Sequence, residues 1–167
     1  MSYDLYMLAP VDGEDPMETL ERRGSYDAPL TPAAADRNRR IADALSASNA
    51  AYAPLEGTDA SRSIAITDQD GLEISLYEDE AAFNFPYWDS LDLDYIATQI
   101  ESASAIVAAE TGWRLYDPQL EQFLDPVRDR DAFRAAFGVG ADAVNQIAAA
   151  PEADPERAPW WKRVIGR

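Results

Sequence analysis

Hydrophobic and polar residues alternate with a period of two in three short stretches of the chain, and these stretches, with two more that are rich in aromatic residues and leucine and end before a proline, predict five β-strands. The first stretch runs from Ser2 to Ala9 and ends at Pro10. The others are centred on Ile64–Ile66, Leu72–Leu76, Phe83–Tyr87 and Trp113–Tyr116. The second and third flank Asp68–Gly71, a run of turn-forming residues, which predicts a β-hairpin.

A helical period appears between these stretches. Asp15-Pro16 and Thr31-Pro32 each place a capping side chain before a proline at the first helical position. We therefore expect a short helix that ends at Gly24 and a longer one that ends near Ala47. Three basic residues of the longer helix are expected to face solvent: Arg37, Arg39 and Arg40.

The clearest helical pattern follows Asp89 or Ser90, either of which is a suitable N-cap. Gly112 supplies a left-handed stop. The apolar positions between them predict one buried face made of Ile96, Ile100, Ala103 and Val107. Two further short helices are expected at Phe133–Phe137 and Val144–Ile147, while residues 49–61 show neither period and are expected to be a connection.

The resulting order, β-α-α-β-β-β-α-β-α-α, predicts an α+β fold. We expect an antiparallel or mixed sheet of about five strands with helices mainly on one face, and a ferredoxin-like arrangement is one candidate. Residues 1–150 are expected to form a single domain. Residues 151–167 are interpreted as a proline-rich linker followed by an aromatic and basic C-terminal tail.

The chain contains no histidine and no cysteine. This composition excludes Ser-His-Asp and Cys-His catalysis, thiol redox chemistry, disulfides and the usual zinc sites. Carboxylates are abundant, but none lies in a recognisable catalytic frame, and there is no glycine-rich phosphate loop. The sequence therefore predicts no catalytic residues, no metal site and no cofactor.

The formal net charge is −17, which argues against direct binding to nucleic acid phosphates. The charge is also uneven, since 11 acidic residues and no basic residue lie between Arg62 and Arg114. One interpretation is a solvated, highly charged surface that keeps the protein soluble. The other is a docking face for a partner with a basic surface.

Aromatic residues at the ends of predicted strands lie close in sequence to these carboxylates. Such rings either cap the core or supply rigid contact area for a partner. The candidate binding residues are accordingly Glu78, Asp79, Glu80, Tyr87, Trp88, Trp113, Tyr116 and Asp117.

The last eight residues, Trp160-Trp161-Lys162-Arg163-Val164-Ile165-Gly166-Arg167, reverse the acidic character of the chain. This segment is interpreted as packing back on the acidic body, docking on a partner or contacting a membrane. No stretch approaches the ~18 consecutive apolar residues of a membrane span, and the first residues do not have the pattern of a signal peptide. We therefore expect a cytoplasmic protein that does not bind membranes.

Two segments resemble a group of small uncharacterised bacterial proteins. These are Met1-Ser2-Tyr3-Asp4-Leu5-Tyr6 and the run Gly112-Trp113-Arg114-Leu115-Tyr116-Asp117-Pro118-Gln119 after an apolar helix. The group begins M-S-x-D-L and carries a helix followed by G-L-x-x-Y-D-P-Q, and this chain has Trp113 where the pattern has leucine. Some members look like immunity proteins of bacterial toxin systems, so the resemblance implies a protein partner.

Taken together, these features favour a non-catalytic protein-binding domain with an acidic and aromatic surface, of which an immunity-type inhibitor of a bacterial toxin is one form. Two alternatives remain open. The first is a hydrolase that uses carboxylates and a divalent metal. The second is an acidic mimic of nucleic acid that occupies a basic binding protein.

Overall fold

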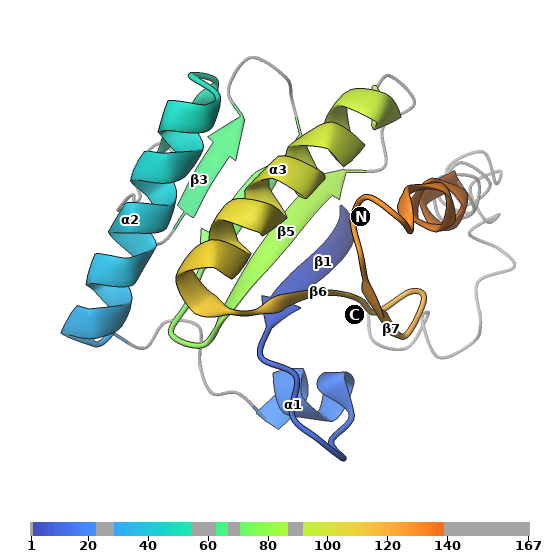
Figure 1. The fold of residues 1–167 in the computed structure, drawn as a ribbon, viewed down its shortest axis with the longest axis horizontal. Helices are drawn as coiled ribbons and strands as arrows, with labels where there is room; N and C mark the ends of the chain where they lie inside the picture. The colour runs from blue at the N-terminus through green and yellow to red at the C-terminus, as the bar shows by residue number, and fades with distance from the viewer. Residues whose placement is uncertain (1, 23–28, 55–62, 67–70, 87–91, 139–167) are drawn as a thin grey trace, which may run out of the picture.

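The computed structural model describes residues 2–22, 29–54, 63–66, 71–86 and 92–138 (Figure 1). The predicted helix at Val144–Ile147, the segment 151–167, and Tyr87 and Trp88 lie outside these residues. In chain order the elements are β1 (Ser2–Leu8), α1 (Pro16–Arg22), α2 (Pro32–Ser48), β2 (Tyr52–Pro54), β3 (Ser63–Ile66), β4 (Glu73–Leu76), β5 (Glu80–Pro86), α3 (Leu93–Thr111), β6 (Arg114–Asp117) and β7 (Gln122–Leu124). A further helix covers residues 130–138.

The strands form one antiparallel sheet in the order β2-β3-β4-β5-β1-β6-β7. Its four central strands, together with α2 and α3, follow the chain order β1-α2-β4-β5-α3-β6. In space these strands are arranged β4-β5-β1-β6, which is the ferredoxin-like arrangement. The predicted α+β fold is therefore confirmed; β3 and β2 extend the sheet beyond β4, and β7 extends it beyond β6.

The helices lie mainly on one face of the sheet, where α2 and α3 run side by side (Figure 1). This face carries the main core, because alternate residues of β1 and β5 point toward the helices: Tyr3, Leu5, Met7, Phe83 and Phe85. The four predicted stripe residues of α3 pack here and are at most 3% exposed. The predicted buried face of α3 is thus confirmed.

Helix α1 lies apart from the others, beyond the end of β1 (Figure 1). It packs on the opposite face of the sheet through a second, small cluster of Leu8, Leu20 and Tyr116. Leu8 follows Met7 in β1, and Tyr116 follows Leu115 in β6, so each points away from the main core. The sheet therefore has two unequal apolar layers.

Local capping chemistry fixes the helix ends largely as expected. Thr31 accepts a hydrogen bond from the backbone N–H of Ala34, and Asp15 accepts one from that of Met17. Gly112 ends α3 in the left-handed conformation, with φ of 71°. The N-cap of α3 is Asp92, however, and not Asp89 or Ser90, because Asp92 accepts hydrogen bonds from the N–H groups of the first helical turn.

Three further expectations differ from the structure. Residues 49–61 were expected to be a connection, but Tyr52–Pro54 pair with β3. Strand β7 was not expected, because three residues are too few to establish a period of two. Arg37 was expected to face solvent, but its guanidinium turns inward, as described below, while Arg39 and Arg40 are exposed.

Candidate functional site

The predicted acidic triplet at the β4–β5 turn does not act as one surface. Glu78 is exposed, and its carboxylate accepts hydrogen bonds from the N–H and the hydroxyl of Thr31, at 2.9 and 2.7 Å, at the start of α2. These bonds lower the pKa of Glu78. Asp79 is exposed, whereas Glu80 is 1% exposed and lies opposite Leu8 in the sheet.

Arg37 joins this turn to Trp113. Its Nη2 atom donates to the carbonyl oxygens of Tyr77 and Glu78, at 2.7 and 2.9 Å. The guanidinium also lies over the indole of Trp113, with 4.8 Å between the guanidinium carbon and the ring centroid. Burial lowers the pKa of Arg37. Trp113 is 9% exposed, so this cation–π contact tightens the packing of the end of α3 against α2 and leaves little of the indole for a partner.

Tyr116 and Asp117 are adjacent in β6 but point to opposite faces of the sheet. Tyr116 belongs to the small cluster beneath α1. Asp117 is fully buried on the other face, where its Oδ2 atom accepts a 2.6 Å hydrogen bond from Tyr3 and its Oδ1 atom accepts the N–H groups of Gln119 and Leu120. These bonds satisfy the carboxylate within the fold and shape the turn into β7.

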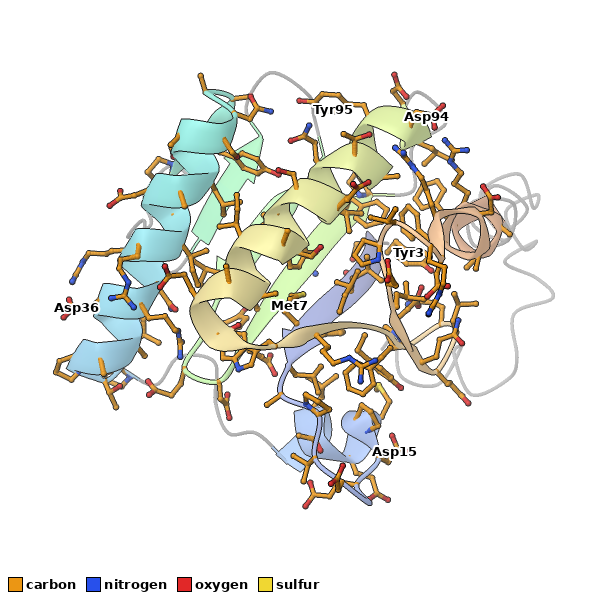
Figure 2. The ribbon with its side chains drawn as sticks, viewed as in Figure 1. Tyr3, Met7, Asp15, Asp36, Asp94 and Tyr95 are labelled. Atoms are coloured by element: carbon orange, nitrogen blue, oxygen red, sulfur yellow. The ribbon has the colours of Figure 1, made fainter. Side chains whose placement is uncertain are left out.

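Other carboxylates of the acidic segment between Arg62 and Arg114 are dispersed by the fold. Asp92 caps α3, Asp94 pairs with Arg134 on helix 130–138, and Glu110 pairs with Arg40 on α2 at 2.9 Å. Figure 2 places Asp94 at the start of α3 and Asp36 on the outer side of α2. A run that is continuous in sequence is therefore not a continuous patch, and the binding role of the eight candidate residues stays a prediction.

A different acidic surface forms around α1. Four exposed carboxylates lie on the loop before α1 and on its first turn, and a fifth lies on the turn between β6 and β7: Asp12, Glu14, Asp15, Glu18 and Glu121. Beside them are the partly buried side chains of Tyr6, Met17 and Phe123, which pack on the small cluster. We call these eight residues the α1 surface; Figure 2 shows Asp15 at its outer side.

Carboxylates of the α1 surface act electrostatically on the phenol of Tyr116. Burial raises the pKa of Tyr116, and Asp15, Glu121 and Asp117 raise it further because they disfavour the phenolate. Arg114 lies at the edge of this region, with its guanidinium 4.7 Å from the ring centroid of Phe123. The carboxylates before α1 and on the β6–β7 turn thus contribute to the same negative electrostatic potential near this aromatic cluster.

Sequence reasoning missed the α1 surface, although part of its signal was present. No basic residue precedes Arg22, and six acidic residues lie before it: Asp4, Asp12, Glu14, Asp15, Glu18 and Glu21. The pairing of β1 with β6 then places the turn that follows β6 near α1. No sequence pattern indicated that contribution, because Asp15 and Glu121 are far apart in the sequence and both act on Tyr116 only in the folded protein.

A cleft of about 710 Å3 lies elsewhere, between α3, the start of β6 and residues 124–128. Its lining combines apolar side chains, among them Met7, Leu115 and Leu124, with the hydroxyls of α3 and four charged residues, Glu101, Arg114, Asp125 and Arg128. Figure 2 shows Met7 between the sheet and α3. This volume falls in the usual range for small-molecule pockets.

Within the described ranges, no group of three or more acidic side chains is arranged to hold a metal ion. The helices of the same ranges include none that is long and apolar enough to cross a membrane. Comparisons with protein-family models, with curated proteins and with solved structures found no match.

Proposed function

We propose that this protein is a non-catalytic protein-binding domain and that its α1 surface engages a partner with a basic surface. The single observation that carries the proposal is that five exposed carboxylates, on the loop before α1, on its first turn and on the β6–β7 turn, accompany the partly buried aromatic side chains of Tyr6 and Phe123. Carboxylates supply long-range attraction to a basic partner, and aromatic side chains supply contact area once the surfaces meet.

The distribution of the arginines supports this location. On α2 and near helix 130–138, Arg39 pairs with Asp36, Arg40 with Glu110 and Arg128 with Asp129. These pairs offset part of the acidic charge on that side of the molecule. At the α1 surface five exposed carboxylates lie together, and the guanidinium of Arg114 is directed at the Phe123 ring, so these carboxylates supply a negative field that can attract a partner.

An immunity-type inhibitor of a bacterial toxin is the specific role that we propose within this class. This role rests on the resemblance in Met1–Tyr6 and Gly112–Gln119. In the structure the two segments lie side by side, because β1 pairs with β6. Both segments contribute to the small cluster beneath α1, so the residues that carry the resemblance support the surface that we propose for binding.

The experiment is a selection of binders from a random peptide library displayed on phage, with the full chain as bait. Selected peptides should be rich in arginine, lysine and aromatic residues, and their affinity should fall as salt rises. A triple variant of the α1 surface, Asp12→Asn/Glu18→Gln/Glu121→Gln, should bind them about tenfold more weakly, because three attractive charges are removed.

The matched control changes three exposed aspartates elsewhere, Asp36→Asn/Asp43→Asn/Asp131→Asn, and so alters the net charge by the same amount. This variant should change the affinity less than about twofold, because distant exposed charges are screened. Equal losses in the two variants would show that net charge alone attracts the peptides. Enrichment of acidic or uncharged peptides would overturn the proposal.

A further inference from the structure

One wall of the cleft beside α3 is formed by residues that directly precede helix 130–138 in the sequence. Residues 124–128 form this wall and lead into helix 130–138, which Phe133 and Phe137 anchor to the core. Arg130 ties the same helix to α3 through hydrogen bonds to the carbonyl of Asp94 and the hydroxyl of Thr98. The cleft thus lies between α3 and a turn that leads into a helix packed on the core, and Val127 at its rim is 66% exposed.

The charged side chains that line the cleft differ in whether they have a hydrogen-bond or ion-pair partner. The lining includes two cations: Arg128 is engaged by Asp129 through two hydrogen bonds of 2.9 Å, and the guanidinium of Arg114 lies over the ring of Phe123. Asp125 accepts the backbone N–H groups of Val127 and Arg128. Glu101, in contrast, is half-buried, and its carboxylate makes no ion pair or hydrogen bond with any residue that the structure describes. The ligand that fits is therefore an apolar group that carries a positive charge.

One segment of the chain itself has this chemistry. Residues 159–167, Pro-Trp-Trp-Lys-Arg-Val-Ile-Gly-Arg, contain two tryptophans, three cations and no carboxylate side chain. Twenty residues, 139–158, separate this segment from Gly138 at the end of the described helix. A chain of that length can extend to roughly 60 Å, which exceeds the radius of a domain of this size severalfold.

We infer that the segment 159–167 docks in the cleft of its own chain, with an indole on the apolar floor formed by Leu115 and Leu124 and a cationic side chain at Glu101. Docking removes apolar surface of the cleft from water and gives the half-buried carboxylate a counter-ion. The cleft shares Arg114 with the edge of the α1 surface, but none of the eight residues of that surface lines the cleft, so this inference does not depend on the proposed function.

The chain contains no cysteine, which allows a direct test by disulfide trapping in the full-length protein. The double variant Ala105→Cys/Val164→Cys places one thiol on the cleft side of α3 and one in the segment, while both tryptophans remain. A disulfide forms when the two Cα atoms approach within roughly 7 Å. Under mild oxidation, an intramolecular disulfide should form at least about tenfold faster than in the matched pair Ala47→Cys/Val164→Cys, whose first site is an exposed alanine on α2.

Two further variants test the stated chemistry in the trapping background. Glu101→Gln should slow trapping severalfold by removing the counter-ion, and Trp160→Ala/Trp161→Ala should slow it by removing the apolar anchor. Thermal melts of the reduced proteins establish that each variant is folded. Equal trapping rates for the Ala105 and Ala47 pairs would overturn the inference. Preferential formation of a disulfide-linked dimer would also overturn it, since the segment would then occupy the cleft of a second copy.

Discussion

The Tyr3 hydroxyl donates a 2.6 Å hydrogen bond to Oδ2 of Asp117, and both residues are fully buried although they are 114 positions apart in the sequence. The bond joins the first strand to the end of β6. The ring of Tyr3 also stacks on Phe85 and contacts Phe133 edge-on, with centroids 5.3 and 5.6 Å apart. Figure 2 shows Tyr3 beside helix 130–138. A polar contact thus fixes the position of an aromatic cluster.

Replacing Tyr3 with phenylalanine should therefore lower the free energy of unfolding by about 1–3 kcal/mol. The variant keeps the aromatic packing and removes one donor from a buried carboxylate that retains its two backbone partners. Urea denaturation at neutral pH measures the loss. A change below about 0.5 kcal/mol would mean that the bond contributes little in solution.

Tyr52 is the matched control for Tyr3, because it is also a buried tyrosine but its hydroxyl is not hydrogen-bonded within the part of the chain that the structure describes. It is 3% exposed, and its hydroxyl has no hydrogen-bond partner among the described residues. Burial raises its pKa, which is consistent with an environment that disfavours the phenolate. Tyr52→Phe should leave the free energy of unfolding unchanged or raise it by up to about 1 kcal/mol, because it removes an unsatisfied buried hydroxyl. A marked loss of stability in the same urea titration would contradict this assignment.

Ile100 lies on the buried stripe of α3 and is 3% exposed. Ile100→Ala should lower the free energy of unfolding by roughly 2–5 kcal/mol, because it removes buried apolar surface and leaves a cavity. Ser102→Ala is the control, since Ser102 is an exposed residue of the same helix and should change stability by less than about 0.5 kcal/mol. Similar denaturation midpoints for the two variants would show that the stripe does not carry the packing.

The hydrogen bonds from Thr31 to Glu78 predict a dependence of stability on pH. They lower the pKa of Glu78 in the folded protein, so the ionised carboxylate favours folding. This contribution is fully present above the unfolded pKa of about 4.3 and is lost as the pH falls through the lower folded pKa. The stability difference between wild type and Glu78→Gln should therefore be larger at pH 6 than near pH 3.

Asp43→Asn is the control for this comparison. Asp43 is an exposed residue of α2, and its substitution changes the net charge of a protein of charge −17 by the same amount as Glu78→Gln. Thermal melts of the three proteins across this pH range separate the specific bond from general charge repulsion. A stability difference for Glu78→Gln that tracks Asp43→Asn at every pH would mean that the cap has no stabilising role.

The sequence by itself determined most of the local structure. The capping residues Thr31 and Asp15 and the stop at Gly112 were recognised because they act on backbone groups within a few residues of themselves. The stripe of α3 was recognised because a period near 3.6 reports which side of a helix is apolar. The α+β class followed from the order of these elements.

The tertiary structure decided where the charged residues go. Glu80 and Asp117 are buried, Arg37 turns inward over Trp113, and Asp15 lies close enough to Tyr116 to act on its pKa. These outcomes depend on strand register and on contacts between residues far apart in the chain, such as β1 with β5 and β6. A charged residue is polar in any sequence pattern, so a pattern cannot show whether its partner lies in solvent or across the sheet.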